Sequence, residues 1–505
     1  MTAIQVITRV LTVPGGRWEI DADLREKLCL TDDGVLHIVE GYGGNPFVLA
    51  FKDRLHRAGH EHDVEYVTPE HIKQLYHGVP VTTGSSKHYQ YLTSENSTGK
   101  QDQVVKILRD ATNAEASDVH FFATPNGHQL RFRVHGQLET VQSFAGEDGR
   151  PLMSSIYETM SESTGTSYRP NEKQDGRLRS EFVTQCGLFG ARIATRPTLN
   201  GPWMAMRLLY DSGKAMSLDE MGYLPVQIDA LTRLIHRVDG IVLLTGTTGS
   251  GKSRSIQTLL SMLLEVMDYS INLVTVEDPV EYRINGATQT PRGPKESWED
   301  AISNMMRLDP DVGLIGEMRD IGSAVAAFQA ALTGHMMWST LHVNSAAASL
   351  QRLHDLGVED SLVYDPGLVK GLVNQSLTRV LCDKCKVPYL RSNRIFAPDL
   401  KSRILQRCEP ELVFVQGEGC EHCSYRGIIN RTAIAEIIPP NLDFMRMFRE
   451  RGRAEAQAFW VNEQGGITKN AHLIQRVNEG IVDPSHGERD VCPLDEDVSV
   501  IGAKA

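Results

Sequence analysis

A glycine-rich loop that ends in a lysine and a serine is the clearest chemical signal in the chain. It fits the pattern G-x-x-x-x-G-K-[ST] and consists of Gly246, Thr247, Thr248, Gly249, Ser250, Gly251, Lys252 and Ser253. In this pattern backbone N–H groups and a helix N-terminus bind phosphate, the lysine lies against the β- and γ-phosphates, and the serine hydroxyl ligates Mg²⁺. The apolar run 241–244 precedes the loop and a helix-like stretch follows from 252 to about 267. We therefore expect a nucleoside triphosphate and Mg²⁺ at this loop.

Carboxylates at the ends of two later apolar runs are candidates for organising Mg²⁺ and the attacking water. Glu277, Asp278 and Glu281 end the run INLVTVEDPVEY, and Glu317 ends the run VGLIGE. Ligand sites of open α/β sheets lie at the carboxyl ends of the strands, so these acids are expected near the phosphate loop. Each acid taken singly also fits a solvated side chain at a strand end.

Two histidines, His335 and His342, flank one apolar strand in the stretch HMMWSTLH. They are seven positions apart, and side chains alternate along a strand with a period of two, so they are not expected to bind one metal from one face. We expect both to be hydrogen-bonding sensors near the phosphate. The alternative is a structural role for each.

Cys382 and Cys385 form one C-x-x-C pair, and Cys420 and Cys423 form a second pair after 34 intervening residues. Four thiolates from two such pairs can hold a structural Zn²⁺ in a closed tetrahedral site. Because the chain has eight cysteines in 505 residues, a metal site is a better interpretation than a disulfide framework. The alternatives are reduced structural cysteines, or a site in which Cys408 replaces one of the four ligands.

The elements that would position these groups can be read from apolar periodicity. Short apolar runs alternate with helix-like stretches over residues 239–342, which is typical of a buried parallel sheet with crossover helices. Residues 320–333 are expected to form an amphipathic helix that ends at Gly334. Upstream, residues 102–116 have a helical apolar stripe, and residues 130–141 alternate like two strands joined by a turn at Gly136.

Polar stretches at 93–100 and 211–214 divide the chain. The predicted parts are a first domain over 1–95 with no interpretable motif, an α+β domain over 101–214, an α/β domain over 215–378, a tetracysteine module over 379–440 and a helical region over 441–505. The final residues, 485–505, are expected to be loosely ordered.

Length and composition exclude several classes of protein. At roughly 150 residues per domain, the chain is expected to contain about three to four domains. The net charge of −12 argues against a protein that coats nucleic acid. Arg9 and Pro14 interrupt the N-terminal apolar run, and no run of about 18 apolar residues is free of charge, so we expect neither an export signal nor a membrane-spanning helix.

Four segments resemble the type II secretion and type IV pilus assembly ATPases in their order and spacing. They are GTTGSGKS, VTVEDPVEY, MRLDPDVGLIGEMRD and TGHMMWSTLHVNSA. The resemblance covers roughly residues 101–485 and includes ASDVH at 116–120 and QDGR at 174–177. It implies an α/β fold: a RecA-like P-loop motor domain, preceded by a PAS-like α+β domain and carrying a small zinc-binding insertion.

The resemblance also implies roles for individual residues. Glu317 becomes the catalytic glutamate, and the three acids of the VEDPVEY segment become an acidic box near Mg²⁺. Arg192 and Arg207 of the PAS-like domain become arginines that reach the nucleotide when domains close, from the same or a neighbouring subunit. The paired cysteines are typical of the assembly branch, because retraction ATPases usually lack them. The residues after Cys423 depart from the family pattern, which indicates a divergent branch.

We therefore predict a hexameric cytoplasmic ATPase motor that couples ATP hydrolysis to assembly of a type IV pilus or a type II secretion pseudopilus. The predicted cofactors are ATP, Mg²⁺ and structural Zn²⁺. The predicted partners are further copies of the chain and a platform protein of the inner membrane, for which residues 1–95 are the docking candidate. No nucleic-acid partner is expected. The protein is predicted to lie at the inner face of the cytoplasmic membrane. The alternatives are a RecA-like nucleic-acid translocase, a pilus retraction motor and a nucleotide-binding scaffold with little turnover.

Overall fold

A computed structural model of the chain describes residues 10–13, 16–39, 42–43, 45–60, 62–77, 99–146, 148–163, 167–210, 216–293 and 295–502. These residues belong to two compact units, within 1–96 and 97–505, and each unit is described by itself. Residues 93–98 of the linker predicted at 93–100, and the break predicted at 211–214, lie outside the described residues.

The first unit contains a three-stranded sheet. Its strands are β1 (Leu28–Leu30), β2 (Val35–Val39) and β3 (Asp63–Val67), and its helices are α1 (Ala22–Arg25), α2 (Pro46–Arg57) and α3 (Pro69–His77). β2 is the middle strand, antiparallel to β1 and parallel to β3. Helix α2 begins where the Asn45 side chain accepts a hydrogen bond from Phe47 N at 3.0 Å, which satisfies one of the free N–H groups of the first turn.

The second unit begins with a seven-stranded antiparallel sheet in the order β6-β5-β4-β10-β9-β8-β7. The strands are β4 (Ala116–Thr124), β5 (Gly127–Val134), β6 (Gln137–Ala145), β7 (Ser161–Ser163), β8 (Gln174–Leu178), β9 (Leu188–Thr198) and β10 (Gly201–Tyr210). Helices α4 (Lys100–Asn113), α5 (Gly149–Ser154) and α6 (Ser180–Val183) share one apolar core with the sheet. The predicted helix and the predicted strand pair that turns at Gly136 are confirmed.

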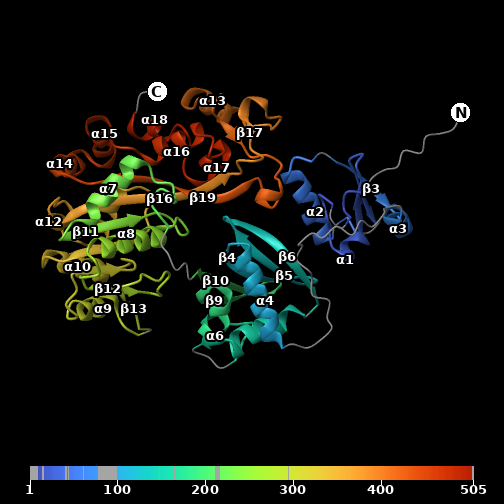
Figure 1. The fold of residues 1–505 in the computed structure, drawn as a ribbon, viewed down its shortest axis with the longest axis horizontal. Helices are drawn as coiled ribbons and strands as arrows, with labels where there is room; N and C mark the ends of the chain where they lie inside the picture. The colour runs from blue at the N-terminus through green and yellow to red at the C-terminus, as the bar shows by residue number, and fades with distance from the viewer. Residues whose placement is uncertain are drawn as a thin grey trace. The chain divides into compact units, whose positions relative to one another are not determined.

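A second seven-stranded sheet follows, in the order β13-β12-β14-β15-β11-β16-β19 (Figure 1). The strands are β11 (Gly240–Thr245), β12 (Leu273–Glu277), β13 (Thr288–Pro291), β14 (Val312–Ile315), β15 (Met336–Leu341), β16 (Val369–Leu381) and β19 (Ile428–Ile438). Neighbouring strands are parallel except at the edge, where β19 is antiparallel to β16. The buried parallel sheet predicted from the apolar runs is confirmed, and with it the α/β fold class, because those runs form β11, β12, β14 and β15.

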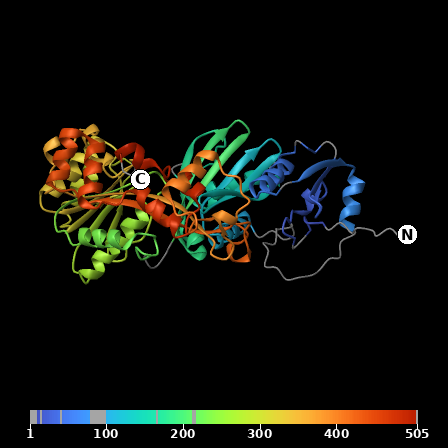
Figure 2. The same ribbon diagram turned by 90° about the horizontal axis from the view of Figure 1, so that it is seen from above.

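Helices cover both faces of the parallel sheet (Figure 2). One face carries α7 (Pro225–Ile235) and α8 (Lys252–Val266); the other carries α9 (Trp298–Met305), α10 (Ile321–Leu332), α11 (Ala348–Asp355), α12 (Asp360–Val363), α14 (Leu442–Arg451) and α15 (Arg453–Gln464). Helix α10 is capped by Asp320, whose side chain accepts from Ser323 N at 2.8 Å, and it ends before Gly334 as predicted. In the ranges that the structure describes, no helix has the length and apolar character needed to cross a bilayer.

Six further α-helices and β-strands follow around β16 and β19, with α16 packed on β19 and α17 packed on β16. They are β17 (Val387–Pro388), α13 (Pro398–Arg407), β18 (Phe414–Val415), α16 (Lys469–Asn478), α17 (Pro484–Asp490) and α18 (Glu496–Ile501). The expectation of a loosely ordered end is wrong for residues 484–501, which form two helices. Their charged side chains have partners that are distant in the sequence: Asp490 pairs with Arg379 at 3.2 Å and Glu488 with Arg403 at 2.6 Å. A charged segment therefore looked solvated only because its partners are not local.

A buried histidine makes the C-terminal helices sensitive to acid. His472 of α16 has no exposed surface, and its Nδ1 accepts a hydrogen bond from Ala435 N at 3.0 Å, which requires the neutral ring. Burial, together with the charge of Arg476, lowers the pKa of His472 to about 4. The unfolded histidine titrates near pH 6.5, so stability that is fully present above this pH is lost as the pH falls from about 6.5 to 4. We expect His472 to reduce the free energy of unfolding by about 2 kcal/mol between pH 7 and pH 5.

Urea unfolding followed by circular dichroism at the two pH values measures this loss. Burial also lowers the pKa of His486 to about 4, so the effect of His472 is the difference between wild type and His472→Gln, which should lose about 2 kcal/mol less on acidification. The exposed His236→Gln is the control and should behave as wild type. An equal acid loss in His472→Gln and wild type would show that this histidine does not carry the effect.

Candidate functional site

The phosphate loop connects the end of β11 to the start of α8, as the sequence predicts. The φ angle of Gly251 is +87°, a value that favours glycine, and α8 begins at the next residue. The Lys252 ammonium donates hydrogen bonds to Gly246 O at 2.8 Å and Thr247 O at 3.1 Å. Burial lowers the pKa of Lys252, while the charges of Glu317 and Glu281 act to raise it. The ammonium therefore lies against the loop carbonyls, where it can meet the phosphates of a bound nucleotide.

Ser253, the last residue of the loop motif, is in contact with one acid of the predicted box. Its hydroxyl donates to Glu281 Oε2 at 2.5 Å. A hydroxyl and a carboxylate oxygen at one point are the oxygen ligands that Mg²⁺ accepts, usually together with substrate phosphates and water. These two side chains fit a Mg²⁺ ion.

The other two acids of the box have different partners. Glu277 is mostly buried, and its Oε1 accepts from Thr275 Oγ1 at 2.8 Å and from Gln289 Nε2 at 3.0 Å. Burial raises the pKa of Glu277, and the two hydrogen bonds oppose that rise. Asp278 Oδ2 accepts from Arg292 Nη2 at 2.7 Å. Glu281 is thus the acid of this segment that reaches the loop, while Glu277 and Asp278 have partners outside it.

Glu317 and His342 lie together at the ends of adjacent strands. β14 and β15 are parallel neighbours, which brings the residues that follow them to the same edge of the sheet. His342 Nε2 lies 3.2 Å from Glu317 Oε1, and Arg319 Nε donates to Glu317 Oε2 at 2.8 Å. Burial lowers the pKa of His342, and the nearby charge of Lys252 lowers it further. A neutral imidazole there can donate a proton to a hydrogen bond with the glutamate.

The structure does not bring His335 to this edge, contrary to the expectation for both histidines. In the pairing of β11 with β15, Thr245 lies opposite Leu341 and Gly240 lies opposite Met336. His335 is therefore at the start of the strand, ~20 Å from the phosphate loop at about 3.3 Å per residue. Its Nδ1 lies 3.0 Å from Thr333 Oγ1. The reason is geometric: His335 precedes β15 at the amino ends of the parallel strands, whereas His342 follows β15 at their carboxyl ends, where the phosphate loop lies.

Arg192 and Arg207 are direct neighbours on the antiparallel sheet. They are paired across β9 and β10. Arg207 Nε donates to Asp118 Oδ1 at 3.0 Å, and Arg192 is exposed. The structure thus brings the two arginines side by side, as a pair of guanidinium groups on one strand pair.

The four predicted cysteine ligands converge at the end of β16. The sulfur of Cys382 lies 3.7 Å from that of Cys420, and the sulfur of Cys423 lies 3.8 Å from those of Cys385 and Cys420. Sulfur atoms around a tetrahedral Zn²⁺, with Zn–S of about 2.3 Å, lie ~3.8 Å apart. The four sulfurs therefore fit Zn²⁺.

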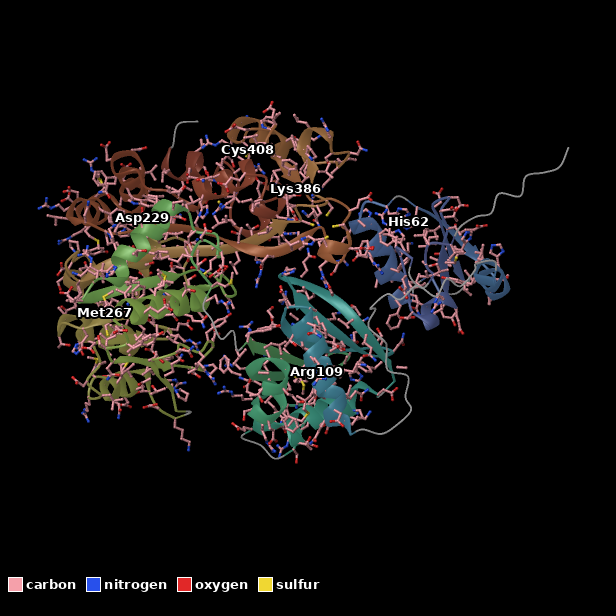
Figure 3. The ribbon with its side chains drawn as sticks, viewed as in Figure 1. His62, Arg109, Asp229, Met267, Lys386 and Cys408 are labelled. Atoms are coloured by element: carbon pink, nitrogen blue, oxygen red, sulfur yellow. The ribbon has the colours of Figure 1, made fainter. Side chains whose placement is uncertain are left out.

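The backbone around the cysteines also suits a thiolate. Cys423 Sγ accepts from Cys420 N at 3.2 Å and from Gly427 N at 3.1 Å. Burial acts to raise the pKa of Cys423, but these backbone hydrogen bonds lower it to about 7. Cys408, the alternative ligand, lies at the end of α13 (Figure 3) and is not among the four clustered sulfurs. Burial raises the pKa of Cys408 to about 12.

Sequence reasoning missed the polar residues of β16 that contact this site. Asn374 is fully buried, and its Nδ2 donates to Thr245 Oγ1 at 2.8 Å and to Val343 O at 3.0 Å. It thus joins the residue before the phosphate loop to the residue after His342. No clear signal in the sequence could have found it, because β16 also contains Lys370, Ser376, Thr378 and Arg379, so a polar residue does not stand out in this segment.

Comparison with known proteins gives one consistent result. The family described as Type II/IV secretion system protein matches residues 94–489. The chain is 35% identical over 337 residues to the Type II secretion system ATPase E of Vibrio cholerae, covering 66% of this chain and 63% of that protein. It is 33% identical over 370 residues to the Type IV pilus assembly ATPase PilB of Pseudomonas aeruginosa, covering 72% of this chain and 62% of that protein. The chain thus spans less than two thirds of the length of both relatives.

Among solved structures, the chain is similar to the ATPase DotB of Legionella pneumophila. The TM-score is 0.54 at 19% sequence identity, covering 78% of this chain and 97% of that chain. DotB of Yersinia pseudotuberculosis gives the same TM-score at 18% identity, covering 81% of this chain and 97% of that chain. At these identities the likeness shows the fold alone.

Proposed function

The chain belongs to the type II/IV secretion system protein family, and on this premise we propose that it is an ATP-hydrolysing motor for the assembly of a type IV pilus or a type II secretion pseudopilus. ATP hydrolysis is supported by one observation: three groups lie together at the carboxyl ends of the parallel strands. They are Lys252 against the phosphate loop, Ser253 with Glu281, and Glu317 with His342. A phosphate anchor, a cation site and a paired carboxylate are the parts that phosphoryl transfer to water requires.

We assign the roles as follows. Lys252 and the loop N–H groups hold the β- and γ-phosphates. Mg²⁺, held by Ser253 and Glu281, would neutralise charge on the phosphate oxygens when bound. Glu317 takes a proton from the water that attacks the γ-phosphorus, as the bond to the ADP oxygen breaks and phosphate leaves. Arg319 and His342 each bind one oxygen of Glu317, which fixes the orientation of the carboxylate.

Arg192 and Arg207 are proposed to bind the γ-phosphate oxygens when the antiparallel domain and the motor domain close, within one subunit or between two. Arg192→Ala is expected to lower kcat by about 10-fold to 100-fold. This loss is smaller than the roughly 10³–10⁵-fold contribution of a single arginine finger to kcat, because Arg207 remains beside the substituted position. Arg196→Ala, an exposed arginine four residues further along β9, is the matched control and should keep wild-type turnover. Normal ATP binding and a normal rate in Arg192→Ala would exclude the role.

The tetracysteine cluster is proposed to bind one structural Zn²⁺ per chain. The spacing of the four sulfurs and the N–H groups that face Cys423 support this proposal. With all four positions occupied by protein, such a site has no open position for catalysis. Its presence favours the assembly branch of the family over retraction.

A homohexamer bound to a platform protein of the inner membrane is the proposed working form, at the cytoplasmic face of that membrane. Two relatives support the setting, since their names place them in type II secretion and type IV pilus assembly. Residues 1–95 remain the candidate for docking to the membrane partner.

The test is steady-state Mg²⁺-ATP hydrolysis by the purified chain, titrated with single- and double-stranded DNA and, separately, with anionic lipid vesicles. Turnover that DNA leaves unchanged supports the secretion and pilus function. A tenfold or greater stimulation by DNA, equal to about 1.4 kcal/mol of barrier, would favour a nucleic-acid translocase instead. The net charge of −12 argues against that outcome.

A further inference from the structure

A buried glutamine on β16 contacts the back of the phosphate loop. Gln375 has no exposed surface. It lies on the strand next to β11, and Thr245, the last residue of β11, pairs with the adjacent Asn374. Because side chains alternate along a strand, Asn374 and Gln375 point to opposite faces. Gln375 points to the face covered by α8.

The side chain of Gln375 is fixed at both of its polar atoms. Its Nε2 donates to Ser250 O, a carbonyl of the phosphate loop, at 2.8 Å. Its Oε1 accepts from the hydroxyl of Tyr223 at 2.6 Å. Since each end of the amide has its own partner, the orientation of the amide is defined and one loop carbonyl is satisfied by it.

Tyr223 closes a ring of contacts around the loop. The tyrosine is fully buried, and its oxygen also lies 2.9 Å from Ser255 Oγ. Ser255 is in the first turn of α8, and its hydroxyl proton faces two acceptors, the Tyr223 oxygen and Gly251 O, which lies 3.3 Å from Ser255 Oγ. Gln375, Tyr223 and Ser255 therefore link β16, the segment before α7 and the first turn of α8 to the carbonyls of Ser250 and Gly251.

Two loop glycines are packed directly against this glutamine. A Cβ on Gly246 would lie 2.3 Å from Gln375 O, and a Cβ on Gly251 would lie 3.1 Å from Gln375 Nε2. The loop is thus held from behind by close packing as well as by hydrogen bonds. In loops of this type backbone N–H groups bind the phosphate.

We propose that Gln375, oriented by Tyr223, is a positioning residue that holds the phosphate loop in its nucleotide-binding conformation. This inference rests on the proposed nucleotide site, and it assigns Gln375 no contact with the nucleotide. A loop held in place before binding loses less conformational freedom when phosphate binds. Removing the Gln375 side chain should therefore weaken nucleotide affinity more than it lowers the rate of hydrolysis.

The test compares Gln375→Leu, Gln375→Asn and Tyr223→Phe with Thr378→Val. Thr378 is equally buried on the same strand, and its hydroxyl donates to Asp490 Oδ2 rather than to the loop. Fluorescent ADP binding gives Kd, ATP hydrolysis gives KM and kcat, and thermal unfolding without nucleotide gives Tm. We expect Gln375→Leu to raise Kd and KM tenfold or more while kcat stays within threefold of wild type. Tyr223→Phe should raise Kd severalfold, and Thr378→Val should lower Tm but leave Kd within twofold.

The outcomes separate this inference from the proposed function. If wild type binds nucleotide but Gln375→Leu and Tyr223→Phe bind equally well, the positioning role is wrong and the proposed function stands. If Thr378→Val weakens binding as much as Gln375→Leu, the effect is general destabilisation and the positioning role is again wrong. If wild type binds no nucleotide, both proposals fail. Should Gln375→Leu not fold, Gln375→Asn and Tyr223→Phe decide the question by the same criteria.

Discussion

Replacing Glu317 with glutamine is expected to lower kcat for ATP hydrolysis by about 10²–10⁴-fold, the range that a general base contributes. Glutamine has nearly the same shape, and its amide oxygen can still accept from Arg319, which in wild type donates to Glu317 at 2.8 Å. It cannot take a proton from water. Nucleotide affinity should therefore stay within a fewfold of wild type, because we assign phosphate binding to Lys252 and the loop rather than to this carboxylate.

Parallel measurements of kcat and of fluorescent ATP binding distinguish a lost base from a damaged site. Glu265→Gln is the control, because Glu265 is an exposed acid near the end of α8, and it should retain wild-type kcat and affinity. Wild-type turnover in Glu317→Gln would remove Glu317 from the mechanism. A loss of binding as large as the loss of turnover would make it a structural residue instead.

The second large effect is expected from the cysteine cluster. Cys382→Ser combined with Cys385→Ser should abolish binding of one zinc per chain, since two of four thiolates are lost and the remaining pair cannot close the site. Metal binding of this kind contributes directly to folding. The segment around the cluster, 382–427, should become sensitive to protease, because apart from the helix α13 its regular elements are the two-residue strands β17 and β18 and two three-residue 3-10 helices.

Metal analysis of the purified chain measures the zinc content, and limited proteolysis measures the protease sensitivity of the segment. Cys408→Ser is the matched control: it removes one thiol of the same module, but its sulfur is not in the cluster, so zinc content should remain at one per chain. Unchanged zinc in the double variant, or zinc loss in Cys408→Ser, would contradict the assignment of the four ligands.

The parts of the site that could be predicted from the sequence are those defined by local pattern. The phosphate loop needs eight consecutive residues between a strand and a helix, and all of these signals are contiguous in the chain. The same holds for α10, whose cap at Asp320 and end before Gly334 are local features. The two C-x-x-C pairs are also local, and the separate expectation that they meet follows from the geometry of a zinc site.

The remaining features depend on strand pairing, which a single sequence does not reveal. His335 and His342 look equivalent as flanks of one apolar run, and only the register of β11 with β15 shows that His342 shares the edge with the phosphate loop. Gln375 contacts Ser250, which is 125 positions away, and Tyr223, which is 152 positions away. The ion pairs that order α17 are likewise long-range, such as Arg379 with Asp490.

The proposed mechanism requires that ATP bound at the Lys252 loop is hydrolysed there, with Glu317 as the base. Its most direct test is a single-turnover experiment, in which an excess of the full chain is mixed with γ-labelled ATP and Mg²⁺ and phosphate formation is followed by rapid quench. Because every ATP is bound, this reports the chemical step without product release. We expect complete hydrolysis by wild type, bound but unhydrolysed ATP in Glu317→Gln, and no bound ATP in Lys252→Ala. Hydrolysis at the wild-type rate in Lys252→Ala or in Glu317→Gln, or intact ATP on wild type, would contradict it.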